Sequence, residues 1–187
     1  MLLIKKIIKE NFSRKDLNKM LEIEKQYFLD YQGVIRKDEE DSGYVYDEQD
    51  IGEMFDDCEI VLGAYSNDEL VGYVALSRGN YDVGEKPDYY IYNFMVDAKL
   101  RGQKLGTILL IRISEFLKEK DFDFVTLDVE ADINTQKYYE KIGFKRFEPK
   151  NKKNEDEFAM IISKNEFLDW AEKSKKSLQM VDEKEQN

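Results

Sequence analysis

The sequence predicts a single α/β domain, and three observations lead to this prediction. The chain has 187 residues, a length that suits one domain with a substantial buried core. Hydrophobic residues make up 42% of it and aromatic residues 13%, well above the composition of disordered chains. Short strand-like runs alternate with longer segments of helical periodicity along the chain.

The first half of the chain predicts three strands and one helix. Residues 2 to 8 alternate loosely between apolar and polar side chains, which is typical of an edge strand. Apolar residues recur at near-helical spacing from Ser13 to Tyr31, which predicts an amphipathic helix. Two further strands are expected at 60–65 and 70–77, because residues 66–69, SNDE, favour a tight turn between them.

The second half predicts four more strands and three helices. One helix begins at Asp132, a residue type that caps helix N-termini well. The last helix begins at a capping box, in which Ser163 is followed three residues later by Glu166. In chain order the strands are expected at 89–96, 123–129, 144–147 and 158–162, and the helices at 105–120, at 132–141 and from 163 onward.

Composition argues against several classes of function. A single cysteine, Cys58, allows no disulfide within the chain, which favours a reducing, cytoplasmic setting. Histidine is absent, which removes Ser–His–Asp and Cys–His catalysis and argues against a catalytic zinc site. A net charge of −11 argues against nucleic acid as a partner. No segment has the pattern of a signal peptide or a membrane span, so no membrane partner is expected.

One segment carries the whole charge imbalance. Residues 38 to 59 contain eleven of the 40 acidic residues and none of the 29 basic ones, so the rest of the chain holds 29 of each sign. The segment also contains Tyr44, Tyr46 and Phe55. An acidic surface with aromatic rings would attract a cationic amine. The alternative is a solvated acidic loop that contributes only to solubility.

The junction at residues 96 to 106, VDAKLRGQKLG, has the features of an anion-binding site. It joins a strand to an apolar helix, whose first backbone N–H groups lack partners within the helix and carry a partial positive charge. Arg101, Gln103 and Lys104 add donors and charge, and two glycines allow close approach to the backbone. We therefore expect a phosphate-bearing ligand here, with an ordinary basic turn as the alternative.

The pattern of this loop narrows the ligand. It matches neither the G-x-x-x-x-G-K-[ST] motif of P-loop nucleotide sites nor the G-x-G-x-x-G motif of Rossmann dinucleotide sites. It resembles the R/Q-x-x-G-x-G/A loop of the GNAT N-acetyltransferase superfamily, with Arg101 at the first position and Gly106 at the last. Lys104 stands at the family's first glycine, a departure that matters if the position requires a positive φ.

A second motif strengthens the resemblance. Residues 132 to 147, DINTQKYYEKIGFKRF, are similar to the family's N-x-x-A-x-x-F-Y-E-K-x-G-F, with Asp132 and Thr135 in place of its Asn and Ala. The two motifs occur in the family's order and spacing, with a strand between them. The resemblance covers roughly residues 58 to 162.

Together the motifs imply the GNAT fold, a mixed and mostly antiparallel twisted sheet flanked by helices. One acetyltransferase domain would span residues 1–162, followed by a helical tail at 163–187. In this family acetyl-CoA is the cosubstrate, no metal is required, and the acetyl group passes directly to an amine through a tetrahedral intermediate. A homodimer is compatible with the family, although no residue requires one.

The resemblance also assigns site residues. Tyr139 matches the tyrosine that protonates the CoA sulfur in several relatives, although a core aromatic would fit the same position. The residues implied to bind acetyl-CoA are Phe94, Met95 and Val96 of the strand, Arg101, Gly102, Gln103, Lys104, Leu105, Gly106 and Thr107 of the loop and helix start, and Asp132.

No general base is assigned by the resemblance. Relatives often place Glu or Asp near positions 92 and 93, where this chain has Tyr92 and Asn93. A water chain, a carboxylate of segment 38–59 or an acceptor of low pKa would each meet the need. Asp128 and Glu130, at the end of the next strand, are further candidates, for which a solvated loop position is the simpler expectation.

The resulting hypothesis is an acetyl-CoA-dependent N-acetyltransferase whose acceptor is a small cationic amine. Polyamines and aminoglycoside-like or streptothricin-like compounds belong to that class. A peptide or protein amine is the nearest alternative. A catalytically silent acyl-CoA-binding module is a third reading, because the strand carboxylate is missing.

Overall fold

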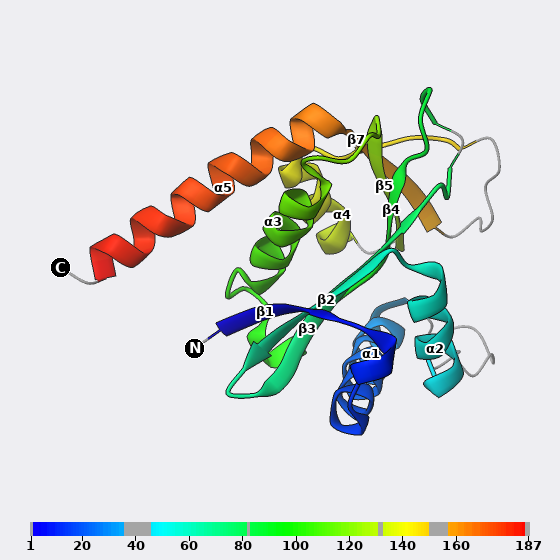
Figure 1. Ribbon diagram of the computed structural model, residues 1–187, viewed down its shortest axis with the longest axis vertical. Coiled ribbons are helices and arrows are strands. Elements are labelled where there is room, and N and C mark those ends of the chain that lie inside the picture. The colour runs from blue at the N-terminus through cyan, green and yellow to red at the C-terminus, as the bar shows by residue number, and fades with distance from the viewer. Residues whose placement is uncertain (1, 36–45, 82, 131–132, 150–156, 186–187) are drawn as a thin grey trace. The chain divides into compact units, whose positions relative to one another are not determined.

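Seven strands with helices around them form a mixed α/β fold in the computed structural model (Figure 1). The structure describes residues 2–35, 46–81, 83–130, 133–149 and 157–185. Within these ranges the strand order of the sheet is β1-β2-β3-β4-β5-β7-β6. The predicted fold class, a mixed sheet flanked by helices, is confirmed.

The chain divides into two compact units. Met1–Ala75 and Asn93–Leu109 form the first, and Leu76–Tyr92 and Leu110–Asn187 form the second. The elements that contribute residues to both are β3 (Glu69–Arg78), β4 (Tyr89–Val96) and α3 (Leu105–Leu117). The basic loop and the end of β4 therefore belong to the first unit, and the second sequence motif belongs to the second.

The strands of the first unit begin with β1 (Leu2–Ile7), which runs antiparallel to β2 (Ile60–Ser66). β1 stands at one end of the strand order, so the predicted edge strand is confirmed. The turn between β2 and β3 has a positive φ at both central residues, Asn67 (50°) and Asp68 (60°). This is the backbone of a two-residue hairpin turn, which Asn and Asp tolerate well.

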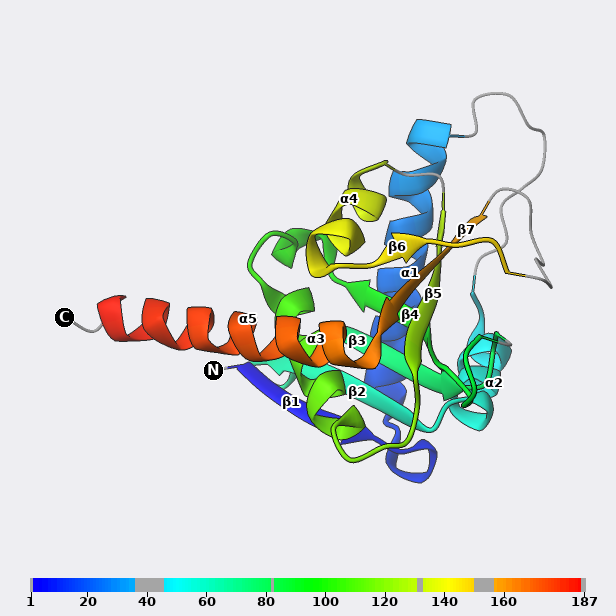
Figure 2. The same ribbon diagram turned by 90° about the horizontal axis from the view of Figure 1, so that it is seen from above.

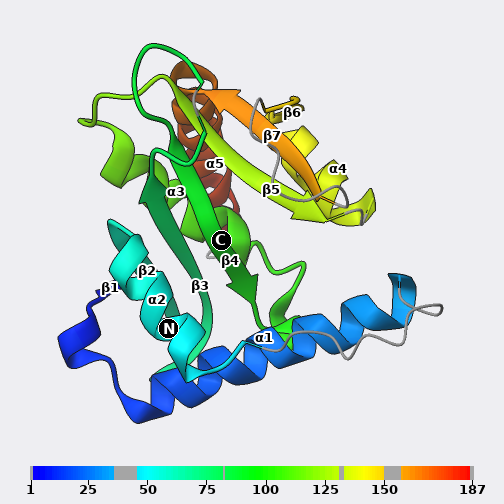
Figure 3. The same ribbon diagram turned by 90° about the vertical axis from the view of Figure 1, so that its right-hand side faces the viewer.

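Two helices pack together in the first unit, α1 (Arg14–Ile35) and α2 (Glu48–Asp57) (Figure 3). The Ser13 hydroxyl caps α1 by accepting a hydrogen bond from the Asp16 amide (3.0 Å). α1 continues four residues beyond its predicted end at Tyr31. The buried side chains of these helices are Met20 and Ile23 on α1 and Ile51 and Met54 on α2.

A solvated loop is one interpretation of the acidic segment 38–59. It is wrong for Glu48–Asp57, which form helix α2. The helix starts at a capping box. Asp47 accepts hydrogen bonds from two amides of the first turn (2.7 and 3.2 Å), and the Asp50 carboxylate accepts one from the Asp47 amide (2.6 Å). Ile51 and Met54 are buried three residues apart. The dense carboxylates obscure this spacing because acidic runs are typical of solvated segments.

The strand–loop–helix junction has the predicted arrangement. β4 has its predicted bounds, and a short 3-10 helix, η2 (Ala98–Leu100), follows it. α3 begins at Leu105 as predicted and ends at Leu117, three residues early. The chain turns there, with a hydrogen bond from the Lys120 amide to the Leu117 carbonyl (2.9 Å).

In the second unit β4 runs parallel to β5 (Phe124–Glu130), with residues 89–91 paired to residues 125–127. β5 also runs antiparallel to β7 (Glu157–Ser163). β7 in turn pairs with β6 (Lys145–Arg146), which is shorter than the strand predicted there. This combination of one parallel and two antiparallel pairings makes the sheet mixed.

Two helices complete the second unit, α4 (Ile133–Ile142) and α5 (Lys164–Glu185), which follows β7 directly (Figure 2). The predicted capping box of α5 is confirmed. The Ser163 hydroxyl accepts a hydrogen bond from the Glu166 amide (3.3 Å), and the Glu166 carboxylate accepts one from the Ser163 amide (3.3 Å). Asp132, the predicted cap of α4, lies outside the described residues. Within the described chain, no helix combines the length and apolarity needed to cross a membrane.

Candidate active site

The loop between β4 and α3 is a succession of tight turns. Asp97 caps η2 by accepting a hydrogen bond from a backbone amide (3.0 Å), and the amides of Leu100 and Gln103 donate to the carbonyls of Asp97 (2.9 Å) and Leu100 (3.4 Å). Gly102 and Lys104 both have positive φ angles, 80° and 63°. The position of the family's first glycine therefore does adopt the left-handed region. Lysine occupies it at a backbone cost that glycine avoids.

This loop presents its polar side chains to solvent. Arg101, Gln103 and Lys104 are exposed, whereas Leu105 is buried and anchors the start of α3. A Cβ added at Gly102 would meet open space, so glycine is suited to that position by its φ angle rather than by crowding. The loop is thus a fixed backbone turn with an accessible cationic surface.

These features fit a pyrophosphate group. The amides of Leu105, Gly106 and Thr107 belong to the first turn of α3, where a helix offers no acceptor of its own and its dipole adds positive charge. Arg101 and Lys104 add two exposed cations. The structure therefore brings together, within one loop and one helical turn, all seven residues predicted between 101 and 107.

The three predicted strand residues, 94–96, lie directly before the loop and are half-buried. β3 approaches them so closely that a Cβ at Gly72 would lie 2.9 Å from the Met95 carbonyl oxygen. The Asp97 amide donates a hydrogen bond to the Val71 carbonyl (3.0 Å). β3 therefore fixes the end of β4 from one side.

An ion pair holds the entrance of the loop on α1. The Lys19 Nζ atom lies 3.0 Å from the Asp97 carboxylate, 3.2 Å from Glu22 and 3.3 Å from Glu69. Both central partners are largely covered, with side-chain exposures of 10% for Lys19 and 15% for Asp97. Burial opposes the charge of Asp97, but the hydrogen bonds from Lys19 and a backbone amide outweigh it and lower the pKa of Asp97. The ion pair of Lys19 with Asp97 therefore fixes the start of the loop on α1.

A buried carboxylate lies beside the same strand end. Glu24 of α1 is only 4% exposed, and its Oε1 atom accepts hydrogen bonds from the Asn93 side-chain amide (2.8 Å) and from the Tyr73 hydroxyl. Asn93 also donates to the Tyr73 hydroxyl oxygen (3.2 Å). Burial raises the pKa of Glu24, although the two hydrogen bonds act in the opposite direction. The first unit thus contains a carboxylate of increased basicity next to β4.

Sequence reasoning missed Glu24, although the sequence carries a signal for it. Helical spacing places Glu24 four residues after Met20 and three before Tyr27, within the apolar stripe that predicts α1. Glutamate is rarely buried unless it is paired. A carboxylate on an apolar stripe therefore marks a candidate, but the residue to which it turns depends on how the helix packs on the sheet.

Tyr139, the predicted acid, lies in the second unit near the end of α4. Its ring is buried and meets the rings of Tyr138 and Phe144 at steep angles, with centroid distances of 5.3 and 5.6 Å. The Tyr139 carbonyl accepts hydrogen bonds from the amides of Gly143 (3.2 Å) and Phe144 (3.1 Å), and Gly143 supplies the positive φ (116°) that ends the helix. The motif therefore has a clear structural purpose, and the role of Tyr139 as an acid stays a prediction.

A second cluster of tyrosines and a carboxylate belongs to the second unit. Asp128 of β5 accepts hydrogen bonds from the hydroxyls of Tyr81 (2.5 Å, to Oδ1) and Tyr90 (3.0 Å, to Oδ2). The Tyr81 ring also packs edge-on against Phe147, with a centroid distance of 5.3 Å. The solvated position expected for Asp128 is therefore wrong, because a phenol covers each of its oxygens. The side chain of Glu130 is not among those described.

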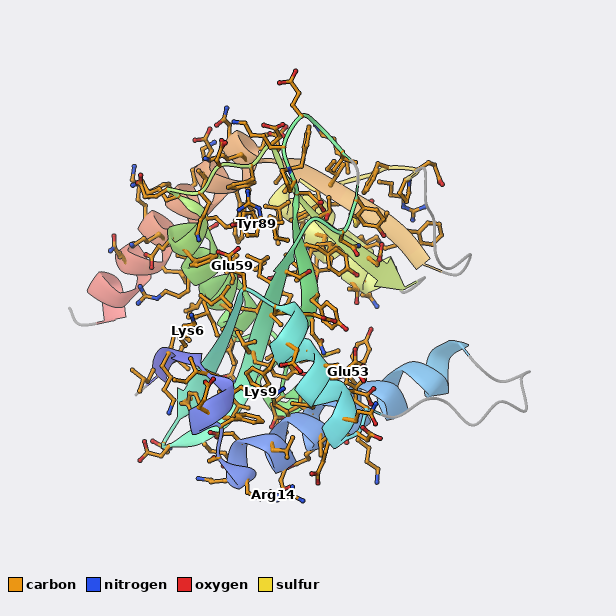
Figure 4. The ribbon with its side chains drawn as sticks, turned by 45° about the vertical axis from the view of Figure 1, so that its right-hand side comes forward. Lys6, Lys9, Arg14, Glu53, Glu59 and Tyr89 are labelled. Atoms are coloured by element: carbon orange, nitrogen blue, oxygen red, sulfur yellow. The ribbon has the colours of Figure 1, made fainter. Side chains whose placement is uncertain are left out.

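The acidic segment uses several of its described carboxylates for structure. The Lys9 Nζ atom lies 2.6 Å from Asp56, and the Arg14 guanidinium donates two hydrogen bonds to Glu48 (2.5 and 2.7 Å) (Figure 4). These pairs attach α2 to Lys9, which precedes α1, and to Arg14, the first residue of α1. Residues 38–45, which hold the rest of the segment, lie outside the described ranges.

A family model and several solved structures resemble this chain. The family described as Acetyltransferase (GNAT) family matches residues 17–144. The PaiA N-acetyltransferase from Thermoplasma acidophilum, solved in complex with coenzyme A, is 18% identical, with a TM-score of 0.66 over 87% of this chain and 99% of that chain. PH1933 from Pyrococcus horikoshii OT3 is 24% identical, with a TM-score of 0.64 over 87% and 98% of the two chains.

A third structure with the same fold is the ribosomal-protein-S18-alanine N-acetyltransferase from Escherichia coli. It is 17% identical to this chain, with a TM-score of 0.61 over 87% of this chain and 94% of that chain. At these identities the three structures show a common fold. No curated protein sequence matches the chain.

Proposed function

The chain belongs to the acetyltransferase (GNAT) family and is therefore an acetyltransferase that uses acetyl-CoA, and we propose that its acceptor is the primary amine of a small cationic molecule. Polyamines and amine-bearing antibiotics form the class of acceptor. The observation that carries this proposal is the concentration of the whole net charge of −11 in residues 38–59. Negative charge clustered in this way attracts cations and raises their local concentration.

The cofactor site follows from the first unit. The amides at the start of α3 and the side chains of Arg101 and Lys104 would hold the pyrophosphate. The family resemblance gives the pantetheine arm to the backbone of residues 94–96, which lead directly into the loop. Acetyl-CoA bound there supplies an activated acyl thioester. The residues of the chain must then remove a proton from the acceptor amine and supply a proton to the departing sulfur.

The carboxylates of α2 support a cationic acceptor. Lys9 and Arg14 engage Asp56 and Glu48, and further carboxylates of the helix remain exposed, among them Glu53 (Figure 4). No basic residue occurs anywhere from 38 to 59 to offset them. A cation approaching this face would therefore meet an excess of negative charge.

A peptide or protein N-terminus is the second candidate acceptor. It is favoured by the similarity in fold to the alanine N-acetyltransferase of ribosomal protein S18. An α-amine has an ordinary pKa of roughly 8, compared with about 10.4 for an alkyl amine such as lysine, so it needs less help from a base. The two candidates therefore make different demands on the chain.

Turnover of acetyl-CoA, measured as free thiol, against a panel of amines tests the proposal. The panel holds polyamines, aminoglycosides, streptothricin-type antibiotics, amino acids and short peptides with free N-termini. We expect turnover with polyamines or antibiotic amines that weakens with salt, because exposed charges are screened. Turnover confined to peptides would replace the proposal with the second candidate, and failure with every amine would contradict both.

A pair of variants links that turnover to the loop. Arg101→Ala together with Lys104→Ala should raise the KM for acetyl-CoA by about tenfold, because two charge-assisted contacts to phosphate are lost. Lys118→Ala together with Lys173→Ala, which removes two exposed cations outside the loop, is the matched control. An equal effect of both changes would show that only overall charge matters.

A further inference from the structure

We propose that Glu24 is the base of this enzyme, accepting the proton that the acceptor ammonium must lose before its nitrogen can attack the thioester. This inference rests on the proposed function, since it requires an amine acceptor. The carboxylate comes from α1 instead of from β4, whose Tyr92 and Asn93 occupy the positions at which relatives often have Glu or Asp.

Position is the first argument. The Glu24 carboxylate lies 2.8 Å from the side chain of Asn93, the residue directly before the strand end at 94–96. A strand rises about 3.3 Å per residue, so Asn93 stands about 10 Å from Val96, where the loop begins. Glu24, the strand end and the loop all belong to the first unit. The carboxylate is therefore held one residue from the segment to which the family assigns the pantetheine arm.

The partners of Glu24 give the second argument. A buried carboxylate that serves structure alone is normally paired with a cation, as Asp97 is paired with Lys19 in the same unit (3.0 Å). Among the described residues, the hydrogen-bond partners of Glu24 are the neutral groups of Asn93 and Tyr73. Burying a carboxylate without a cation opposes folding. Perturbed carboxylates of this kind cluster at functional sites.

The geometry of the hydrogen bonds gives the third argument. Tyr73 and Asn93 both donate to Oε1 of Glu24, so a proton added to Oε2 leaves both bonds intact. The carboxylate can therefore change its protonation state without losing its position. Burial raises its pKa and makes it a stronger base than an exposed glutamate. Tyr46, before α2, also acts electrostatically on Tyr73.

The proposed step conserves atoms and charge. An ammonium acceptor gives one proton to Glu24, and its freed lone pair forms the new N–C bond with the acyl carbon. The C–S bond breaks with its electron pair on sulfur, and the second nitrogen proton balances that sulfur as a thiol. Glu24 then returns its proton to solvent. The products are an amide, free CoA and one released proton.

The test compares the wild-type enzyme with Glu24→Gln, which keeps the shape and the acceptor oxygen for Tyr73 and Asn93. The substrates are the panel amine with the highest turnover and its β-fluorinated analogue, whose fluorine atoms lower the amine pKa. We expect kcat/KM to fall about 100- to 1000-fold for the basic amine and less than about tenfold for the fluorinated amine, which is already neutral. Acetyl-CoA affinity, measured by calorimetry, should change less than about twofold.

A second variant provides a readout that a structural role would not change. Tyr73→Phe leaves the carboxylate but removes a hydrogen bond that lowers its pKa. The base must be ionised to act, so the acidic limb of kcat/KM should move to higher pH in Tyr73→Phe. Glu24→Asp should recover part of the activity lost in Glu24→Gln, because it restores a carboxylate.

The outcomes separate the inference from the proposed function. Wild-type turnover with no loss in Glu24→Gln would overturn the inference and leave the proposed function standing. An equal loss for basic and fluorinated amines would also overturn it, because the defect would not depend on a proton. Absence of wild-type turnover with every amine would overturn the proposed function, and the inference with it.

Discussion

Two clusters in this chain use the same chemistry in different surroundings. In the first unit Glu24 is buried, and both of its donors, Tyr73 and Asn93, bind the same carboxylate oxygen. In the second unit Asp128 is half-buried, and two tyrosines bind one oxygen each. Burial raises the pKa of Glu24, whereas Asp128 is held at both oxygens by phenol donors.

The difference shows that the arrangement of donors, rather than the residue types, separates a base from a structural anchor. A carboxylate held at one oxygen can take a proton at the other. A carboxylate whose two oxygens both accept from phenols has no donor-free oxygen, so a proton added to either one competes with an existing hydrogen bond. Asp128 is therefore the weaker candidate for proton transfer, although sequence reasoning considers it and overlooks Glu24.

Outside the Glu24 cluster, the largest effect is expected at Tyr139 of the second unit, which the family resemblance assigns as a proton donor. If Tyr139 protonates the departing sulfur, Tyr139→Phe should lower kcat by roughly ten- to a thousand-fold with little change in acetyl-CoA affinity. Tyr138→Phe, its neighbour on α4, is the matched control and should leave kcat within about threefold. Steady-state kinetics with a single amine measure both, and an unchanged kcat in Tyr139→Phe would return Tyr139 to the core.

The next effect is on stability and has opposite signs in the two clusters. Asp128→Asn should lower the free energy of unfolding by about 2 kcal/mol, because charge-assisted hydrogen bonds from two phenols are weakened. Glu24→Gln should raise it by about 1 kcal/mol at pH 8, because a buried charge without a cation is removed. Urea unfolding measures both changes.

The stability change in Glu24→Gln should depend on pH, because the pKa of Glu24 is raised in the folded protein. The folded pKa of Glu24 is raised, so the stability that protonation provides is present below the unfolded pKa of about 4.3 and is lost as pH rises through the folded value. The advantage of Glu24→Gln should therefore vanish near pH 4. A variant that is less stable than the wild type at pH 8 would contradict this account of Glu24.

A third carboxylate, Asp97, sharpens the comparison because its partner is a cation. Lys19→Met should lower the free energy of unfolding by about 2 kcal/mol at pH 7, since it leaves Asp97 covered and unpaired. The pKa of Asp97 is lowered, so its contribution is present above the unfolded pKa of about 3.9 and is lost as pH falls through the folded value. The two proteins should converge below that range in urea unfolding. Lys25→Met, exposed on the same helix, should change little at any pH.

The smallest effect is expected at Lys104 of the basic loop, whose side chain is exposed. Lys104→Gly should raise the free energy of unfolding by about 1 kcal/mol, because glycine adopts a φ of 63° without strain. It should weaken acetyl-CoA binding about threefold at low salt and less at high salt, since one exposed cation is lost. Gly102→Ala is the control of opposite sign. Thermal unfolding with and without acetyl-CoA measures both, and a destabilised Lys104→Gly would count against backbone strain at this position.

Local signals predicted the fold well where they were strong. β4 and the start of α3 have their predicted positions, because an aromatic run and a long apolar helix meet at a glycine-containing basic loop. The hairpin turn at Asn67 and Asp68 follows from residues that tolerate positive φ. These features depend on neighbours in the sequence, so the sequence is enough to find them.

The features that escaped prediction depend on contacts between distant residues. Glu24 becomes a candidate base only because Asn93, 69 residues away, lies against it. Asp128 is not solvated because it accepts hydrogen bonds from Tyr90 of β4 and from Tyr81, which precedes β4. α2 is a local feature, but its carboxylates conceal a helical spacing of buried side chains. Contacts between distant residues explain why Glu24 and Asp128 were mispredicted, and the acidic composition explains why α2 was.

The buried Glu24 has a consequence for laboratory evolution of this chain. A library screened for heat resistance alone would favour neutral side chains at position 24, because they relieve an uncompensated charge. The same library screened for growth that depends on acetylation would reject them. Neutral side chains at position 24 would thus be enriched under the first selection and depleted under the second, and sequencing the two pools would reveal the difference.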